Sequence, residues 1–232
     1  MVPLNDIQEA THRLVRTVDD MSDEDFAAAS LLPDWSRAHV VAHLTLNAEG
    51  LAGALTGITR GRSVPMYASP EERDDDIAEL ATAPPRILRT RLLGATSEFA
   101  AAMEAVPADA WGTHIERTPG GPTFVAGAVP GMREREVEIH HADLALAYSP
   151  SDWPPAFTER LLEAMSNRDR PQPFSVYATD LDRTWRCGTG GDGGDGMTVS
   201  GTSADLGWWL TGRGDGEGLT SDNGTLPGIE EW

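Results

Sequence analysis

The stretch from Arg133 to Leu144, REREVEIHHADL, combines helix-forming residues with carboxylate and imidazole side chains that any fold of this chain has to accommodate. Residues four apart lie on one face of an α-helix, so Glu136 and His140 project together, next to apolar Ile139. A carboxylate and an imidazole are two of the three protein ligands of a catalytic zinc site, with ligand distances of about 2.0–2.2 Å. The pair therefore predicts part of a metal site. A solvated helix face is the alternative, since this spacing is common.

A third ligand is expected from a second amphipathic helix upstream. Ser36 is a good N-cap for this helix, which runs toward Leu55. His43 lies in the apolar part of the pattern and is the preferred candidate. His39 competes with it, because His39 and His43 lie one turn apart and could bind a metal elsewhere together with Glu49. A buried histidine without a metal is the more common outcome for either position.

Three other side chains have a possible chemical role. Asp143 is better suited to orient the imidazole of His140 than to serve as a fourth ligand, although an ordinary charged flank is the more common case. Arg213 lies between two glycines, where a guanidinium can bind a carboxylate with two hydrogen bonds or simply face solvent. Cys187, the single cysteine, lies in a β-prone run, which favours a buried, inert thiol. One cysteine also excludes a disulfide framework and a thiolate-rich zinc site.

The first 170 residues show apolar side chains at helical spacing, interrupted by proline and glycine. Residues 111–131 are rich in Gly, Pro and Thr and predict a long irregular crossover of the kind found in four-helix bundles. The predicted helices cover about 5–18, 36–55, 69–84, 85–107, 131–148 and 154–165.

The character of the chain changes after Pro171. Short β-prone runs follow, and a glycine-rich segment predicts a hairpin between the last two of them, Thr184–Cys187 and Met197–Ser200. A short helix starts at Thr202. We therefore expect an α+β protein with two domains, an all-α bundle in residues 1–170 and a small α+β domain in residues 171–232.

The charge balance excludes some partners. The chain has 18 Lys+Arg and 37 Asp+Glu, a formal net charge of −19, so general affinity for nucleic acid or an anionic membrane surface is not expected. No apolar run approaches the length of a membrane span, and the N-terminus does not resemble a secretory signal. We expect a cytoplasmic protein.

Four segments resemble the mycothiol-dependent maleylpyruvate isomerase family, and together they span nearly the whole chain. They are Leu32–His43, Pro65–Tyr67, Arg135–His140 with Asp143–Leu144, and Gly212–Gly216 with Leu219–Ser221. The resemblance implies a DinB-like four-helix bundle followed by a small sterol-carrier-like α+β domain. It also implies zinc held by His43, Glu136 and His140, and an essential arginine at Arg213.

The activity implied by the resemblance is the cis-trans isomerisation of maleylpyruvate to fumarylpyruvate, in gentisate-type aromatic breakdown. The cofactors would be Zn²⁺ and mycothiol, whose thiolate adds reversibly to the double bond. We expect a monomer whose partners are a diketo acid and a low-molecular-weight thiol. A thiol S-transferase on the same scaffold, and a non-catalytic binding module, are the alternatives.

Overall fold

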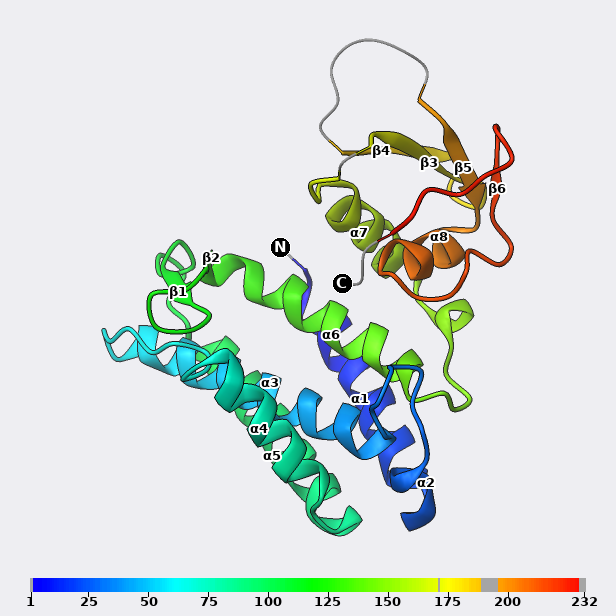
Figure 1. The fold of residues 1–232 in the computed structure, drawn as a ribbon. Coiled ribbons are helices and arrows are strands. Elements are labelled where there is room, and N and C mark those ends of the chain that lie inside the picture. Colours follow the sequence, from blue (N-terminus) through cyan, green and yellow to red (C-terminus); the bar gives the residue numbers. More distant parts are fainter. Residues whose placement is uncertain (1, 171, 189–195, 230–232) are drawn as a thin grey trace. The chain divides into compact units, whose positions relative to one another are not determined.

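The computed structural model describes residues 2–170, 172–188 and 196–229. Internal contacts divide the chain into two compact units (Figure 1), Met1–Leu146 and Ala147–Trp232. We call them the bundle unit and the C-terminal unit and describe each by itself.

Long helices of the bundle unit lie side by side and enclose its apolar core (Figure 1). The helices α1, α3, α5 and α6 form the bundle, and α4 packs against α3. In chain order the elements are α1 (Leu4–Asp20), α2 (Asp23–Ala27), α3 (Arg37–Thr59), α4 (Pro70–Ala81), α5 (Pro85–Ala105), β1 (His114–Glu116), β2 (Thr123–Val125), the 3₁₀ turn η1 (Ala126–Ala128) and α6 (Val129–Asp143).

Helix α3 is the centre of the bundle unit. It contacts α4, α5 and α6, and Val40, Leu44, Leu51 and Leu55 are each 0% exposed. A helix with apolar residues on all sides is stable only when it is surrounded by other elements. A polar side chain placed in this helix, such as His43, is therefore held in the protein interior, where it needs partners.

Two glycines of α3 provide a matched test of this packing. A Cβ on Gly53 would meet nothing within 4 Å, whereas a Cβ on Gly50 would lie 2.7 Å from the carbonyl oxygen of Met66. We expect Gly53→Ala to raise the free energy of unfolding by about 0.5–1 kcal/mol, the usual gain from removing glycine in a helix. Gly50→Ala is expected to lower it, because the backbone at Met66 has to move.

Urea denaturation of both variants measures these two changes. Stabilisation by both substitutions would contradict the close approach of residue 66 to α3.

The segment expected to be an irregular crossover contains a small hairpin. Strands β1 and β2 pair antiparallel with Ile115 opposite Phe124, and Ile115 is 2% exposed. The hairpin also fixes the loop after α3. The backbone N–H of Met66 donates to the carbonyl of Glu116, and that of Tyr67 donates to the carbonyl of Arg117, both over 2.9 Å.

The C-terminal unit is a small sheet with helices on one face (Figure 1). The sheet order is β4-β3-β5-β6, and α7 and α8 pack on each other and on this sheet. The elements are the 3₁₀ turn η2 (Pro150–Asp152), α7 (Pro155–Ser166), β3 (Phe174–Ala178), β4 (Arg183–Cys187), β5 (Thr198–Gly201), α8 (Ser203–Leu210) and β6 (Thr220–Ser221). The expected α+β class is confirmed.

Two sequence expectations differ from this arrangement. The predicted domain boundary at residues 170/171 lies later than the division between Leu146 and Ala147. Helix α7 belongs to the C-terminal unit because it packs on α8 and β4; for example, Trp185 Nε1 donates to Glu163 over 3.1 Å.

The second difference concerns the predicted hairpin between β4 and β5, which is wrong. Strand β5 pairs parallel with β3, and β4 lies on the opposite side of β3. Most of the glycine-rich connection lies outside the described residues.

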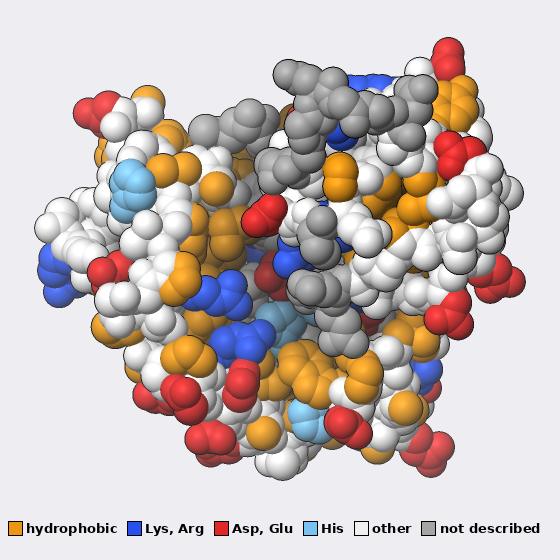
Figure 2. Space-filling view, turned by 45° about the horizontal axis from the view of Figure 1, so that its top comes forward, with side chains coloured by type: hydrophobic (Ala, Val, Ile, Leu, Met, Phe, Trp, Pro, Cys, Tyr) orange, Lys and Arg blue, Asp and Glu red, His pale blue; other side chains and the backbone are white. Residues whose placement is uncertain are grey.

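The surface agrees with the acidic composition. Acidic side chains are spread over the visible face rather than gathered in one patch (Figure 2). Among the described residues, no helix combines the length and apolarity that a membrane crossing requires.

Candidate metal centre

Hydrogen bonds in the N-terminal turn of α3 distinguish the two histidines that compete as the third metal ligand. The backbone N–H of Ser36 donates to Nδ1 of His39 over 3.3 Å, and the Ser36 hydroxyl lies 2.7 Å from the same nitrogen. The His39 side chain therefore helps to cap the N-terminus of α3. His43, one turn later, is 5% exposed and points toward α6.

Helix α6 presents Glu136 and His140 to His43. The Oε2 atom of Glu136 lies 2.8 Å from Nε2 of His43 and 3.4 Å from Nε2 of His140. The two imidazole rings meet edge to face, with centroids 4.7 Å apart. Potential ligand atoms of these three residues all lie within 4.8 Å of one another. The structure thus brings together the pair predicted from spacing and the preferred upstream histidine.

Burial and hydrogen bonding set the charges of this cluster. Burial lowers the pKa of His43 to about 4, although Glu136 acts in the opposite direction. Burial would raise the pKa of Glu136, but hydrogen bonds from His140 and His43 hold it well below its usual value. The pKa of His140 is raised: burial opposes this, and Asp143 and Glu136 more than offset the burial. At neutral pH, the imidazole of His43 is neutral and the carboxyl group of Glu136 is ionised. These are the forms in which the two side chains bind a divalent cation.

Asp143 supports the third donor. It is 0% exposed, and its Oδ2 lies 2.8 Å from Nδ1 of His140. A carboxylate at this nitrogen fixes the imidazole so that Nε2 faces the cluster, the usual outer partner of a metal-binding histidine. The neighbouring His141 instead lies 2.8 Å from the Thr17 hydroxyl of α1 through its Nε2. Adjacent histidines of α6 therefore serve different neighbours.

The donor set fits a zinc-like divalent ion. Two buried imidazoles and one partly buried carboxylate between α3 and α6 match a three-ligand catalytic site with one position left for a water or substrate. His140 has the carboxylate partner expected of such a ligand.

The remaining predicted residues lie in the C-terminal unit. Arg213 follows α8, with its guanidinium 5.6 Å from the centroid of the Trp208 ring and donating to the Thr211 carbonyl over 3.1 Å. Its role in a reaction stays a prediction. Cys187 is buried in β4, and burial raises the pKa of its thiol to about 11. The chain's own cysteine is therefore protonated at neutral pH and is not a nucleophile.

Sequence reasoning missed Arg73 on α4, whose Nη2 lies 3.3 Å from Nδ1 of His43. Arginine is common on the surface of helices, and no spacing links α4 to α3 or α6. Tyr67 next to it also escaped notice as a site residue: the Arg73 guanidinium lies 5.7 Å from the centroid of its ring. Burial raises the pKa of Tyr67, so its phenol is a neutral hydrogen-bond donor.

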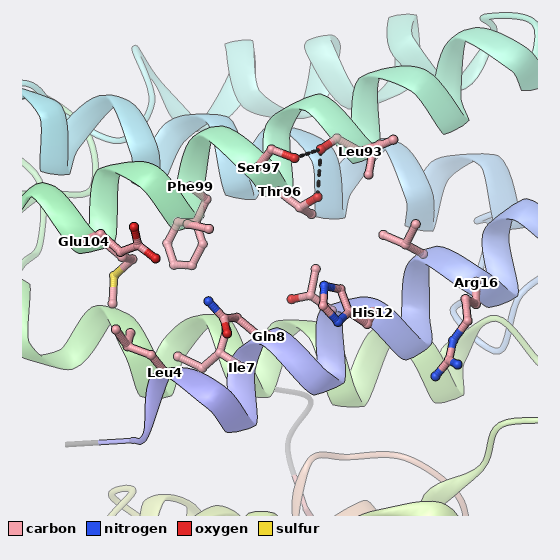
Figure 3. Close-up of a pocket in the computed structure, with 14 residues that line it drawn as sticks. Leu4, Ile7, Gln8, His12, Arg16, Leu93, Thr96, Ser97, Phe99 and Glu104 are labelled. Atoms are coloured by element: carbon pink, nitrogen blue, oxygen red, sulfur yellow. Dashed lines mark hydrogen bonds between the residues drawn. The ribbon is translucent and has the colours of Figure 1, made fainter.

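The bundle unit also contains a cavity of about 580 Å³, between α1 and α5 (Figure 3). Ile7 of α1 and Phe99 of α5 contribute to its apolar walls, and His12 of α1 also lines it (Figure 3). None of the cluster residues lines this cavity, so it is separate from the candidate metal centre.

Comparison with known proteins identifies the family of this chain. Residues 7–145 match the domain family described as mycothiol maleylpyruvate isomerase N-terminal domain. The chain belongs to the mycothiol maleylpyruvate isomerase family. Residues 152–230 match the C-terminal domain of the same family, and the gap between the two matches contains the division at Leu146 and Ala147.

Solved structures extend this likeness over the whole chain. The crystal structure of the mycothiol-dependent maleylpyruvate isomerase is 27% identical, with a TM-score of 0.89, and the match covers 100% of this chain and 98% of that one. A histidine-to-alanine mutant of the same enzyme matches with a TM-score of 0.88, at the same identity and coverage. No match is found among curated proteins.

Proposed function

We propose that this protein is a zinc-dependent isomerase that uses mycothiol to convert maleylpyruvate to fumarylpyruvate, in gentisate-type aromatic breakdown. The observation that carries the proposal is the convergence of His43, Glu136 and His140 in a member of this family. The similarity to the solved isomerase over the full length of both chains supports it.

His43, Glu136 and His140 would hold the ion, and Asp143 would keep the His140 imidazole oriented. When bound, a zinc-like ion supplies one chemical property: it lowers the pKa of a thiol so that a thiolate is present at neutral pH. The protein needs this external thiol, since Cys187 is buried and protonated.

Isomerisation requires temporary single-bond character in the cis double bond. The mycothiol thiolate adds to one alkene carbon, a C–S bond forms, and the π electrons move onto the conjugated carbonyl as an enolate. Rotation about the new single bond follows. Return of the electron pair then breaks the C–S bond, releases the thiolate and leaves the trans alkene. Arg213 is proposed to bind a substrate carboxylate during these steps.

Turnover of maleylpyruvate measured with and without mycothiol tests the proposal, on protein whose zinc content has been determined. Turnover is expected only when both zinc and the thiol are present, and a chelator should remove it reversibly. Protein that takes up no stoichiometric metal after zinc reconstitution would contradict the proposal. A stable thioether product would assign an S-transferase instead.

A further inference from the structure

The contact between Arg73 and His43 fixes the position of the His43 proton. A guanidinium has donors only, so Nδ1 of His43, 3.3 Å from Nη2 of Arg73, accepts a hydrogen bond. A neutral imidazole carries a single N–H, which is then at Nε2, where it donates to Glu136 over 2.8 Å.

Metal binding through Nε2 requires the opposite arrangement. A neutral imidazole that uses Nε2 as a metal ligand carries its proton on Nδ1. The Nδ1–H of His43 would then face the N–H groups of Arg73, and neither side has an acceptor. His140 has no such conflict, since its Nδ1 lies beside the carboxylate of Asp143. A loaded site therefore disfavours the present position of the Arg73 guanidinium.

Arg73 has capacity to bind something else. Its Nη1 pairs with Asp74 over 2.6 Å, but that carboxylate is 68% exposed, and such surface pairs contribute little. Its Nε is buried without a hydrogen-bond partner among the described residues. A guanidinium with one weak surface ion pair and one N–H without an acceptor is suited to bind a carboxylate, which accepts two parallel hydrogen bonds.

A cavity of about 210 Å³ adjoins this guanidinium and is lined in part by Tyr67, Arg73, Glu49 and Asp76. The described lining contains two acidic residues. Glu49 accepts hydrogen bonds of 2.7 and 2.9 Å from Arg91, and Asp76 is the second acid. The cavity size suits a small organic acid rather than a large ligand.

We propose that Arg73 and Tyr67 form a binding site for a small organic carboxylate, and that this site and the metal site strengthen each other through the Nδ1 proton of His43. The inference rests on the proposed function in one respect, that the cluster holds a metal. Coupling between two sites is reciprocal, so zinc raises the affinity for the carboxylate by the same factor as the carboxylate raises the affinity for zinc.

Isothermal titration calorimetry with Zn²⁺ and maleate tests the coupling. In the wild-type protein, zinc is expected to tighten maleate binding and maleate to tighten zinc binding. In Arg73→Gln, the factor by which zinc tightens maleate binding should fall by about tenfold or more, since the hydrogen-bonded charge pair between Arg73 and maleate is lost. Arg86→Gln, which removes an exposed arginine of α5, is the charge-matched control and should behave as wild type.

Zinc affinity without maleate tests the proton. Arg73→Gln and Arg73→Met remove the same charge, but only glutamine offers an oxygen that accepts from Nδ1–H. We expect Arg73→Gln to bind zinc more tightly than Arg73→Met, and both more tightly than wild type. Equal coupling in wild type and Arg73→Gln would overturn the carboxylate site. Equal zinc affinity in the two variants would overturn the link through His43.

These outcomes are separate from the proposed activity. Coupled binding without mycothiol-dependent turnover would refute the isomerase and leave this inference standing. Turnover with unchanged coupling in Arg73→Gln would do the reverse.

Discussion

Alanine at His43, Glu136 or His140 is expected to abolish stoichiometric zinc binding and turnover. Each substitution leaves two of the three donors that converge between α3 and α6. Loss of an outer partner alone typically costs 10–100-fold in metal affinity, so loss of a direct ligand should cost more than about 100-fold. Inductively coupled plasma mass spectrometry of the purified variants measures the metal, and the same preparations are assayed for isomerisation.

His39→Ala and His141→Ala are the matched controls, since each removes a histidine adjacent to the cluster without removing a donor. His39→Ala loses the contact with Ser36 at the start of α3, and His141→Ala loses the contact with Thr17. Both should keep their zinc, with some loss of stability. Zinc lost from His39→Ala and kept by His43→Ala would show that the wrong histidine has been assigned.

Arg213→Lys is expected to lower kcat/KM about 10- to 150-fold with normal zinc content. The change keeps the positive charge but removes the two-pronged hydrogen bonding of a guanidinium to a substrate carboxylate. A hydrogen bond to a charged group contributes about 1.5–3 kcal/mol, which corresponds to that range. Steady-state kinetics with maleylpyruvate and mycothiol, beside a metal determination, measure the effect.

Arg183→Lys is the control within the C-terminal unit, because Arg183 pairs with Glu159 and Glu163 at the surface. It should leave the kinetics unchanged. An Arg213→Lys protein with wild-type kinetics would remove Arg213 from the reaction.

Local signals predicted the helices of the bundle well. Ser69 before Pro70 marks the start of α4, and Pro84–Pro85 separates α4 from α5, because proline suits the first turn of a helix and interrupts its interior. Helix α6 ends at Asp143, earlier than the predicted Tyr148. Ala145 has a φ of 53°, a left-handed conformation that ends the helix without glycine or proline.

Strand pairing was less predictable because it depends on distant partners. Strands β1 and β2 are 3 residues long each, too short for a clear alternating pattern, and their hairpin is identified by its contacts with Met66 and Tyr67 rather than by its own sequence. For β4 and β5, a glycine-rich connection suggested a local turn, yet Val176 of β3 has Trp185 of β4 on one side and Val199 of β5 on the other. Nothing in the sequence of either run specifies which neighbour it pairs with.

The candidate site was predictable where spacing within one helix carries the information. Glu136 and His140 share a face of α6, and His43 lies in an apolar pattern that places it inside the bundle. Arg73 was not predictable, because only the packing of α4 on α3 brings it to His43.

The burial of Cys187 has a consequence for how such a protein tolerates oxidative stress. Under oxidising conditions, exposed protein thiolates form mixed disulfides with a low-molecular-weight thiol. Peroxide oxidises the same exposed thiolates to sulfenic acid. Cys187 is the single cysteine of the chain, and it is buried in β4 with a raised pKa. A buried, protonated thiol of this kind resists thiolation even where a low-molecular-weight thiol is concentrated. Under the proposed function, the activity should therefore not depend on a reductase that restores protein thiols.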